Sequence, residues 1–255
     1  MSNYLDFVTS ASWVDITPMF EPCPVDDIVA EIRDVENMFL EERDPDQYEK
    51  LKKKGATGIG EHFDDQKEWS AVTLFSSTGD YKDILTQGIL PNQDMKTYKK
   101  SFDNIKKHKW TQLKPLMPKT VSWVKNQIGQ YMTFSYIKIA KLGPRGDVPI
   151  HTDIPEEDFD FLNTRNTYNM LNSFLVELNF PDGVKAWHDD VELPYQKGSV
   201  IFCNQSKSHG TVNNSDENRY NLRIQGLHNK KFRDKLMSSI DTLEVYPNES
   251  KHIFS

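Results

Sequence analysis

The sequence has few cysteines and no long apolar run. Only two of its 255 residues are cysteines, Cys23 and Cys203, and no Cys-x-x-Cys pair occurs. This excludes a disulfide-stapled scaffold and a thiolate zinc site, and each cysteine is expected to be a small buried apolar residue. No segment approaches 18 consecutive apolar residues, and the first residues lack the charged and apolar parts of a secretion signal. We therefore expect a cytoplasmic protein that does not enter a membrane.

Positive charge is also scarce relative to negative charge. The chain carries 31 Lys and Arg against 38 Asp and Glu, a net charge of −7, which is a poor match for a phosphate backbone. We expect no nucleic-acid partner. The content of hydrophobic residues, 37%, and the length suffice for a substantial core.

Hydrophobic periodicity divides the chain into three parts. Residues 1–66 are predicted to form a helical segment that packs on the core, with helical spacing clearest in residues 25–40. Residues 67–228 are predicted to form the strand-rich core, with inserted helices at 97–130. Residues 229–255 are expected to be a C-terminal helix and tail.

Short runs of β-branched and aromatic residues, separated by Gly, Pro, Asn and Asp, indicate strands in the core. They lie at 69–76, 131–140, 172–180, 198–203, 210–213 and 219–225. Because the runs after 131 leave no room for crossover helices, the pattern predicts a mainly β protein with flanking helices, built as a sandwich or barrel. The segment Trp187-His188-Asp189-Asp190 is interpreted as an exposed connection.

Three residues of the strand-rich part have the spacing of a metal site. His151 and Asp153 are two positions apart, so their side chains leave one face of an extended segment together. His209 follows 58 residues later and could supply a third ligand from a neighbouring strand. Two histidines and one carboxylate that leave positions open on the metal are the arrangement of non-haem iron(II) oxygenases. The triad therefore favours iron with oxygen chemistry.

Arg219, ten residues after His209, is the predicted anchor for an acidic co-substrate, because its planar fork suits a carboxylate. Arg223 shares its face, and Arg219 is preferred on spacing. Asn221, between them, could add a hydrogen bond to the co-substrate or serve strand packing. Structural roles are expected for His62, His188 and His228.

The motif His151-x-Asp153, then His209, then Arg219 resembles the signature of the 2-oxoglutarate and iron(II)-dependent dioxygenases. Three segments are similar to the aspartyl/asparaginyl β-hydroxylase family, which includes free-proline hydroxylases. They are Pro149–Asp153, Tyr195–Phe202 and His209–Leu222, within a similarity over about residues 131 to 228 and a weaker match at 69–79.

The resemblance implies a double-stranded β-helix, a jelly-roll or cupin-like core with the metal at its open end. It implies a hydroxylase that uses Fe(II), 2-oxoglutarate and O2, releases succinate and CO2, and oxidises an sp3 carbon of an Asp-, Asn- or Pro-like amino acid. The substrate could be free or part of a peptide, and we favour a free amino acid. Arg145 and Arg165 are candidate cations for such a zwitterion. The oligomeric state is left open.

Two other functions are compatible with the same residues. A zinc hydrolase could use the triad with an open position, but it has no use for Arg219. A jelly-roll module could retain the fold and only bind a ligand, since fold alone does not determine function.

Overall fold

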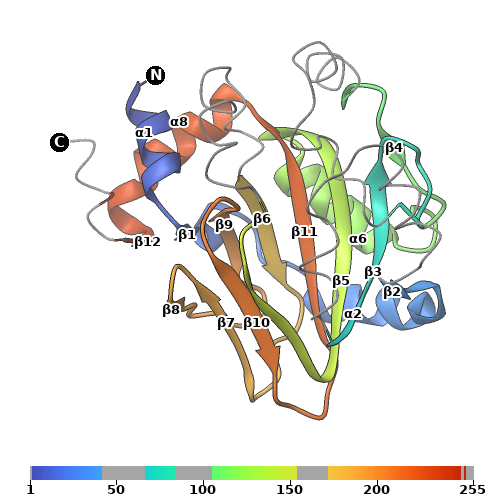
Figure 1. Ribbon diagram of the computed structural model, residues 1–255. Helices are drawn as coiled ribbons and strands as arrows, with labels where there is room; N and C mark the ends of the chain where they lie inside the picture. The colour runs from blue at the N-terminus through green and yellow to red at the C-terminus, as the bar shows by residue number, and fades with distance from the viewer. Residues whose placement is uncertain (1, 42–66, 84–104, 154–171, 248–249, 251–255) are drawn as a thin grey trace, which may run out of the picture.

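The computed structural model describes residues 2–41, 67–83, 105–153, 172–247 and 250. This part of the chain is mainly β, with one curled antiparallel sheet and a few helices against it (Figure 1). The strands are β1 (Trp13–Asp15), β2 (Leu40–Glu41), β3 (Lys67–Ser76), β4 (Lys109–Trp110), β5 (Met132–His151), β6 (Asn172–Glu177), β7 (Val184–His188), β8 (Val191–Glu192), β9 (Val200–Asn204), β10 (His209–Asn213), β11 (Arg219–His228) and β12 (Glu244–Tyr246). The helices are α1 (Ser2–Ser10), α2 (Val25–Asp34), α6 (Pro118–Trp123) and α8 (Lys230–Ser239), with a π-helical turn at Val124–Ile128 and 3-10 turns at Thr17–Met19, Glu36–Met38 and Ile240–Thr242.

The long strand β5 gives the sheet its jelly-roll form. Its first half, up to Leu142, pairs with β11, and its second half, from Asp147 to His151, pairs with β10. The chain bends between the halves at Gly143-Pro144-Arg145-Gly146, where Arg145 has a positive φ of 59°. The order β12-β1-β9-β6-β11-β5-β10-β7-β8 therefore curls back on itself, and β3 pairs with the first half of β5. The predicted double-stranded β-helix class is confirmed.

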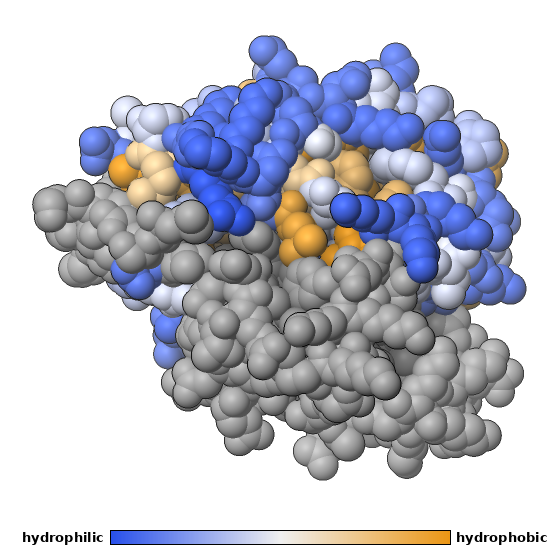
Figure 2. Space-filling view, turned by 90° about the horizontal axis from the view of Figure 1, so that it is seen from above, coloured by the Kyte–Doolittle hydropathy of each residue, from blue (hydrophilic) through white to orange (hydrophobic). Residues whose placement is uncertain are grey.

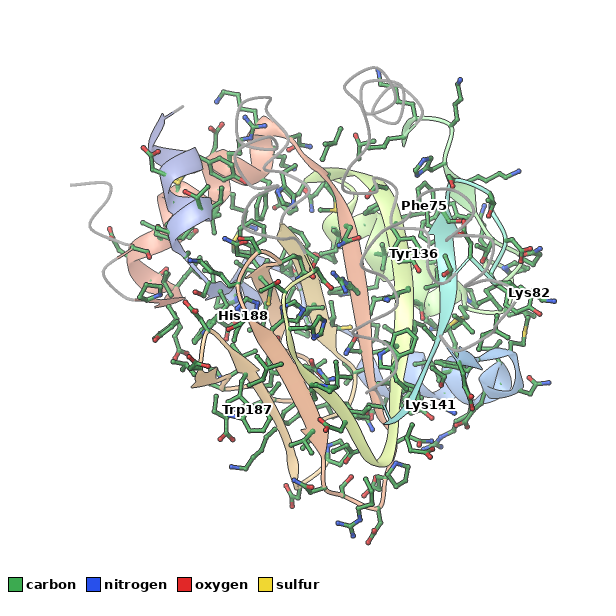
Figure 3. The ribbon with its side chains drawn as sticks, in the orientation of Figure 1. Phe75, Lys82, Tyr136, Lys141, Trp187 and His188 are labelled. Carbon is green, nitrogen blue, oxygen red and sulfur yellow. The ribbon has the colours of Figure 1, made fainter. Side chains whose placement is uncertain are left out.

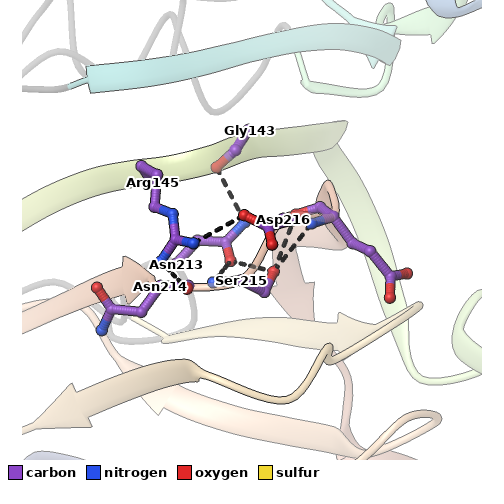
Figure 4. A network of polar contacts seen from close by, with 7 residues as sticks. Gly143, Arg145, Asn213, Asn214, Ser215 and Asp216 are labelled. Atoms are coloured by element: carbon purple, nitrogen blue, oxygen red, sulfur yellow. Dashed lines mark hydrogen bonds and ion pairs between the residues drawn. The ribbon is translucent and has the colours of Figure 1, made fainter.

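The turn between β10 and β11 is tied to the bend in β5 (Figure 4). The Asn213 amide nitrogen donates to the carbonyl oxygens of Leu142 at 3.1 Å and Gly143 at 2.9 Å. Arg145 forms an ion pair with Asp216 at 2.7 Å on the surface of the same turn. These bonds join the β10–β11 turn to the point where the two halves of β5 separate.

Alternation along the strands gives the sheet two different faces. Apolar side chains such as Val72, Ile137 and Leu222 are buried on the face that packs against α1, α2, α6 and α8. The opposite face, here called the inner wall, carries the polar residues Lys138, Ser173, Glu177, Arg219, Asn221 and Arg223. A period of two residues allows one strand to serve both faces. The inner wall is where chemistry can take place.

A carboxylate from one helix caps another on the apolar face. Glu31 of α2 accepts hydrogen bonds from the backbone N–H groups of Lys119 at 2.6 Å and Thr120 at 3.0 Å. The Thr120 hydroxyl donates to the same carboxylate at 2.7 Å. Because α6 begins with Pro118, which has no N–H, Glu31 satisfies the donors that follow it.

All six predicted strands are confirmed, and six short strands among the described residues were missed. These are β1, β2, β4, β7, β8 and β12, of two to five residues each, and β1 and β2 lie in the segment expected to be helical. The helix predicted at 25–40 ends at Asp34 and is followed by a 3-10 turn and β2. Within 97–130 the regular helices are confined to 118–128 and β4 stands at Lys109–Trp110, while residues 97–104 lie outside the described ranges. The three-part division of the chain stays a prediction.

The face seen from above combines apolar and hydrophilic side chains. Apolar side chains reach the surface in its middle and hydrophilic ones flank them (Figure 2). Among the described residues, no helix has the length and apolar character needed to cross a bilayer.

Candidate metal centre

The structure brings His151, Asp153 and His209 together where the second half of β5 meets β10. The two histidines are cross-strand partners, and Asp153 follows the end of β5. One ligand atom from each residue lies within 4.8 Å of the other two. The Asp153 backbone N–H donates a hydrogen bond to the Gln205 carbonyl oxygen at 3.2 Å. This bond holds Asp153 beside the paired strands β5 and β10.

Hydrogen bonds orient both imidazoles for metal binding. Nδ1 of His151 lies 2.8 Å from the Pro149 carbonyl oxygen, and Nδ1 of His209 lies 2.9 Å from that of Lys207. Because a carbonyl only accepts, these contacts assign the proton to Nδ1 and leave Nε2 as the ligand atom. Both Nε2 atoms face Asp153, at 3.5 and 3.6 Å from its carboxylate oxygens.

The electrostatics favour a cation between these residues. Burial raises the pKa of Asp153, but Arg223, His151 and His209 outweigh it and hold that pKa well below its usual value. Burial lowers the pKa of His151, yet the hydrogen bond and charge of Asp153 outweigh it and raise that pKa overall. The three side chains are 13 to 19% exposed, so they are largely but not completely buried. Two nitrogens and one carboxylate suit iron(II) with positions left open, and they also suit zinc.

A third histidine, His188, lies against the site, although the sequence analysis placed it in an exposed connection. His188 ends β7, is 2% exposed and stacks on His209 with ring centroids 5.3 Å apart, and Figure 3 shows it among the strands. The predicted exposed connection at 187–190 is therefore wrong for Trp187 and His188, which belong to β7. Burial lowers the pKa of His188 to about 3. The alternation of buried Val184, Ala186 and His188 was the available signal.

Arg219 lies deep on the inner wall and is bound to a carboxylate that the sequence analysis did not single out. Its Nε and Nη2 donate to the two oxygens of Glu177 at 3.0 and 2.5 Å. Glu177 is fully buried and Arg219 is 5% exposed. Burial raises the pKa of Glu177, and the charge of Arg219 opposes this shift. Asn221 lies beside the guanidinium, and with its oxygen turned toward Arg219 it accepts from Nη1 at 3.2 Å.

Arg223 lies level with the metal ligands. Its Nη2 contacts both Asp153 Oδ2 and Gln205 Oε1. The two arginines predicted to share a face therefore have different partners. Arg219 pairs with an internal glutamate, and Arg223 pairs with a candidate metal ligand.

The remaining singled-out residues lie away from the metal ligands or outside the described residues. Arg145 is in the exposed turn network, and Arg165 and His62 are not among the described residues. His228 is buried among aromatic rings on the helix side and stacks on Phe174, as its expected structural role requires. Cys203 is buried as predicted, and Cys23 is half-buried.

The chain is similar to several known proteins. No curated protein sequence matches the chain. Among solved structures, a prolyl-4-hydroxylase from Pseudomonas putida is similar at 10% identity and a TM-score of 0.42, covering 88% of this chain and 97% of that one. A prolyl hydroxylase from Trichoplax adhaerens, solved with a hypoxia inducible factor peptide, is similar at 10% identity and a TM-score of 0.45, covering 91% and 90%. The model of the family described as aspartyl/asparaginyl beta-hydroxylase matches residues 25–229, and the chain therefore belongs to that family.

Proposed function

We propose that the protein is an iron(II)- and 2-oxoglutarate-dependent dioxygenase that hydroxylates an sp3 carbon of an amino acid, with succinate and CO2 as co-products. The observation that carries this is the convergence of His151, Asp153 and His209, with both imidazoles oriented by backbone carbonyls. Membership in the hydroxylase family supports it.

The triad would hold the metal through two Nε2 atoms and one carboxylate oxygen. Bound there, iron(II) would supply the redox chemistry that couples decarboxylation of 2-oxoglutarate to oxidation of the substrate. The chain's own contribution is to fix the ligands. Pro149 and Lys207 hold the imidazole tautomers, and Arg223 keeps Asp153 ionised.

The distal carboxylate of 2-oxoglutarate is assigned to Arg219. This arginine lies four residues from Arg223 along β11, roughly 13 Å at about 3.3 Å per residue, so it is displaced inward from the metal ligands. Glu177 occupies the edge formed by Nε and Nη2, and Nη1 faces Asn221 on the other edge. That second edge is where a carboxylate would be received, with Asn221 beside it.

Buried polar atoms without partners support a polar ligand inside the barrel. Among the described residues, Trp13 Nε1, Ser173 Oγ, Arg223 Nε and both nitrogens of His188 are buried without a hydrogen-bond partner. These residues lie on the inner wall or beside the metal ligands. A buried donor left unpaired is destabilising by about 1–3 kcal/mol, so a ligand that pairs with several of them gains binding energy.

The zinc-hydrolase alternative explains less of this site. It uses the triad but gives no role to an arginine on the inner wall.

A turnover assay distinguishes the dioxygenase from the zinc hydrolase. The iron-loaded protein is incubated with 2-oxoglutarate, O2 and a panel of free amino acids and short Asp-, Asn- or Pro-containing peptides. Succinate release with a gain of one oxygen in one panel member is expected. Hydrolysis with zinc, without any need for 2-oxoglutarate, would refute the proposal.

A further inference from the structure

The turn between β9 and β10 contacts two of the three candidate metal ligands through its backbone carbonyls. It comprises residues 205–208, here called the β9–β10 turn. The Gln205 carbonyl oxygen accepts a hydrogen bond from the Asp153 N–H at 3.2 Å. The Lys207 carbonyl oxygen lies 2.9 Å from Nδ1 of His209 and orients that imidazole. A displacement of this turn would therefore move Asp153 and His209 together.

The β9–β10 turn follows Asn204, the last residue of β9, whose amide oxygen closes the start of the turn. Asn204 Oδ1 accepts from the backbone N–H of Ser206 at 3.0 Å and from its hydroxyl at 2.7 Å. The Lys207 N–H donates to the Asn204 carbonyl oxygen at 3.2 Å. Asn204 is only 1% exposed. The conformation of the turn therefore depends on this buried amide.

The amide nitrogen of Asn204 is bound to the N-terminal helix. Nδ2 donates to the carbonyl oxygens of Val8 at 3.1 Å and Thr9 at 3.4 Å, both in the last turn of α1. Carbonyls in the last turn of a helix have no partner within the helix, so an outside donor satisfies them. The Asn204 N–H also donates to the Ser12 carbonyl oxygen at 2.9 Å. Because α1 buries Phe7 and Val8 in the main apolar cluster, it is a fixed support for the turn.

The contacts of Asn204 require a side chain that both donates and accepts. An amide donates toward α1 and accepts from the turn, whereas an apolar side chain does neither. A carboxylate would only accept, and it would place a negative charge at the C-terminal end of a helix, where negative charge is unfavourable. Asparagine is therefore matched to both of its neighbours.

We propose that Asn204 is a positioning residue for the metal centre, because it joins the β9–β10 turn to α1 and so holds the carbonyls that orient Asp153 and His209. This inference rests on the metal site of the proposed function. Replacing a residue that orients metal ligands typically lowers metal affinity about 10- to 100-fold. Asn204 acts through the turn on two ligands at once. The N-terminal helix is thereby part of the support of the metal centre.

The test measures the affinity of the full-length, metal-free protein for Mn(II) by calorimetry. Asn204→Leu keeps the approximate size of the side chain and removes every hydrogen bond of the amide, so it is expected to weaken Mn(II) binding about tenfold. Ser206→Ala removes one hydroxyl bond at a half-buried residue and should weaken Mn(II) binding about threefold. This milder variant decides the question if Asn204→Leu does not fold.

Asn229→Leu is the matched control, because Asn229 also uses both ends of its amide. Its Oδ1 accepts from the Phe232 N–H at 3.1 Å at the start of α8, and its Nδ2 donates to the Gln130 carbonyl oxygen at 2.8 Å. The control should lower the free energy of unfolding but leave the Mn(II) affinity within about twofold of the wild type. At saturating iron(II) and 2-oxoglutarate, the visible charge-transfer band should shift in Asn204→Leu and stay in place in Asn229→Leu.

Two results would overturn the inference about Asn204. One is an unchanged Mn(II) affinity in Asn204→Leu, or in Ser206→Ala if the first variant does not fold. The other is an equal loss of affinity in Asn229→Leu, because the effect would then follow from lower stability alone. A wild type that binds Mn(II) but develops no charge-transfer band would refute the proposed function and leave the role of Asn204 in place. A wild type that binds no metal would refute both.

Discussion

Glu177 and Arg219 form a two-pronged ion pair in the interior, with donor–acceptor distances of 3.0 and 2.5 Å and almost no solvent exposure. The glutamate belongs to β6 and the arginine to β11. Such a pair fixes the orientation of the guanidinium, but it also cancels the charge that would attract the carboxylate of a co-substrate. Glu177 is therefore expected to tune the affinity for 2-oxoglutarate.

Replacing Glu177 by glutamine tests this directly. Glu177→Gln keeps the size of the side chain and removes its negative charge, so Arg219 regains attraction for an incoming carboxylate. We expect 2-oxoglutarate to bind roughly three- to tenfold more tightly, equivalent to about 1 kcal/mol. Calorimetry on the Mn(II)-loaded protein measures the affinity. Glu192→Gln, at an exposed ion pair with Lys185, is the matched control and should change nothing. An unchanged affinity in Glu177→Gln would show that Arg219 does not receive the co-substrate.

The two arginines of β11 should respond differently to truncation. Arg219→Leu removes the proposed anchor and is expected to weaken 2-oxoglutarate binding roughly 10- to 100-fold, since a charged hydrogen-bonded contact contributes about 1.5–3 kcal/mol. Arg223→Leu should weaken it much less. The same calorimetric titration compares the two variants. If Arg223→Leu lost more 2-oxoglutarate affinity than Arg219→Leu, the co-substrate carboxylate would have to be assigned to Arg223 instead of Arg219.

Glu31 should contribute strongly to stability although it lies far from the site. Glu31→Ala leaves the N–H groups of Lys119 and Thr120 without their acceptor. We expect the free energy of unfolding to fall by about 2–4 kcal/mol, measured in urea. Asp27→Ala, on the same helix, removes only an exposed ion pair with Lys119 at 3.9 Å, so it should lower the free energy of unfolding by about 1 kcal/mol or less. Equal losses would contradict the assigned cap.

His228 makes stability depend on pH. Burial lowers its pKa in the folded protein from 6.5 to about 3, so below pH 6.5 the unfolded chain binds a proton that the folded chain does not. The contribution of His228 to the free energy of unfolding is therefore fully present above pH 6.5, and it decreases as the pH drops from 6.5 toward 3. At pH 5 the loss is about 2 kcal/mol, at about 1.36 kcal/mol per pH unit.

The variant His228→Phe removes this titration and keeps an aromatic ring beside Phe174. Urea unfolding at pH 7 and pH 5 should give a loss of stability between the two pH values that is about 2 kcal/mol smaller than in the wild type. If both proteins lose the same amount, His228 does not carry the dependence.

Much of the fold was predictable because the strands of the core are long enough to show a pattern. β3, β6 and β11 have at least six residues each, and their alternation indicates both the strand and its two faces. β1 and β12 have three residues each and β8 has two, too few to establish a period. Their strand conformation is imposed by partners far away in the sequence, as Val14 pairs with both Phe202 and Val245.

The grouping of His151, Asp153 and His209 was predictable from the sequence. The His151-x-Asp153 spacing places two side chains on one face of an extended segment, and the motif that continues to His209 supplies the third. The position of Glu177 against Arg219, and of His188 against His209, depends on which strands become neighbours in the curled sheet. Single-sequence patterns carry no information about that neighbourhood, so these two contacts could not be foreseen.

The most direct test of the metal centre is a spectrum recorded without oxygen. Iron(II) and 2-oxoglutarate are added anaerobically to the metal-free protein, and the visible charge-transfer band of the chelate is followed. The wild type should develop the band. His151→Ala, Asp153→Ala and His209→Ala should each abolish it, because two remaining ligands hold a labile dication too weakly. Asp216→Ala, which removes a surface carboxylate, should retain it. A wild type without the band, or triad variants that keep it at full strength, would contradict the account.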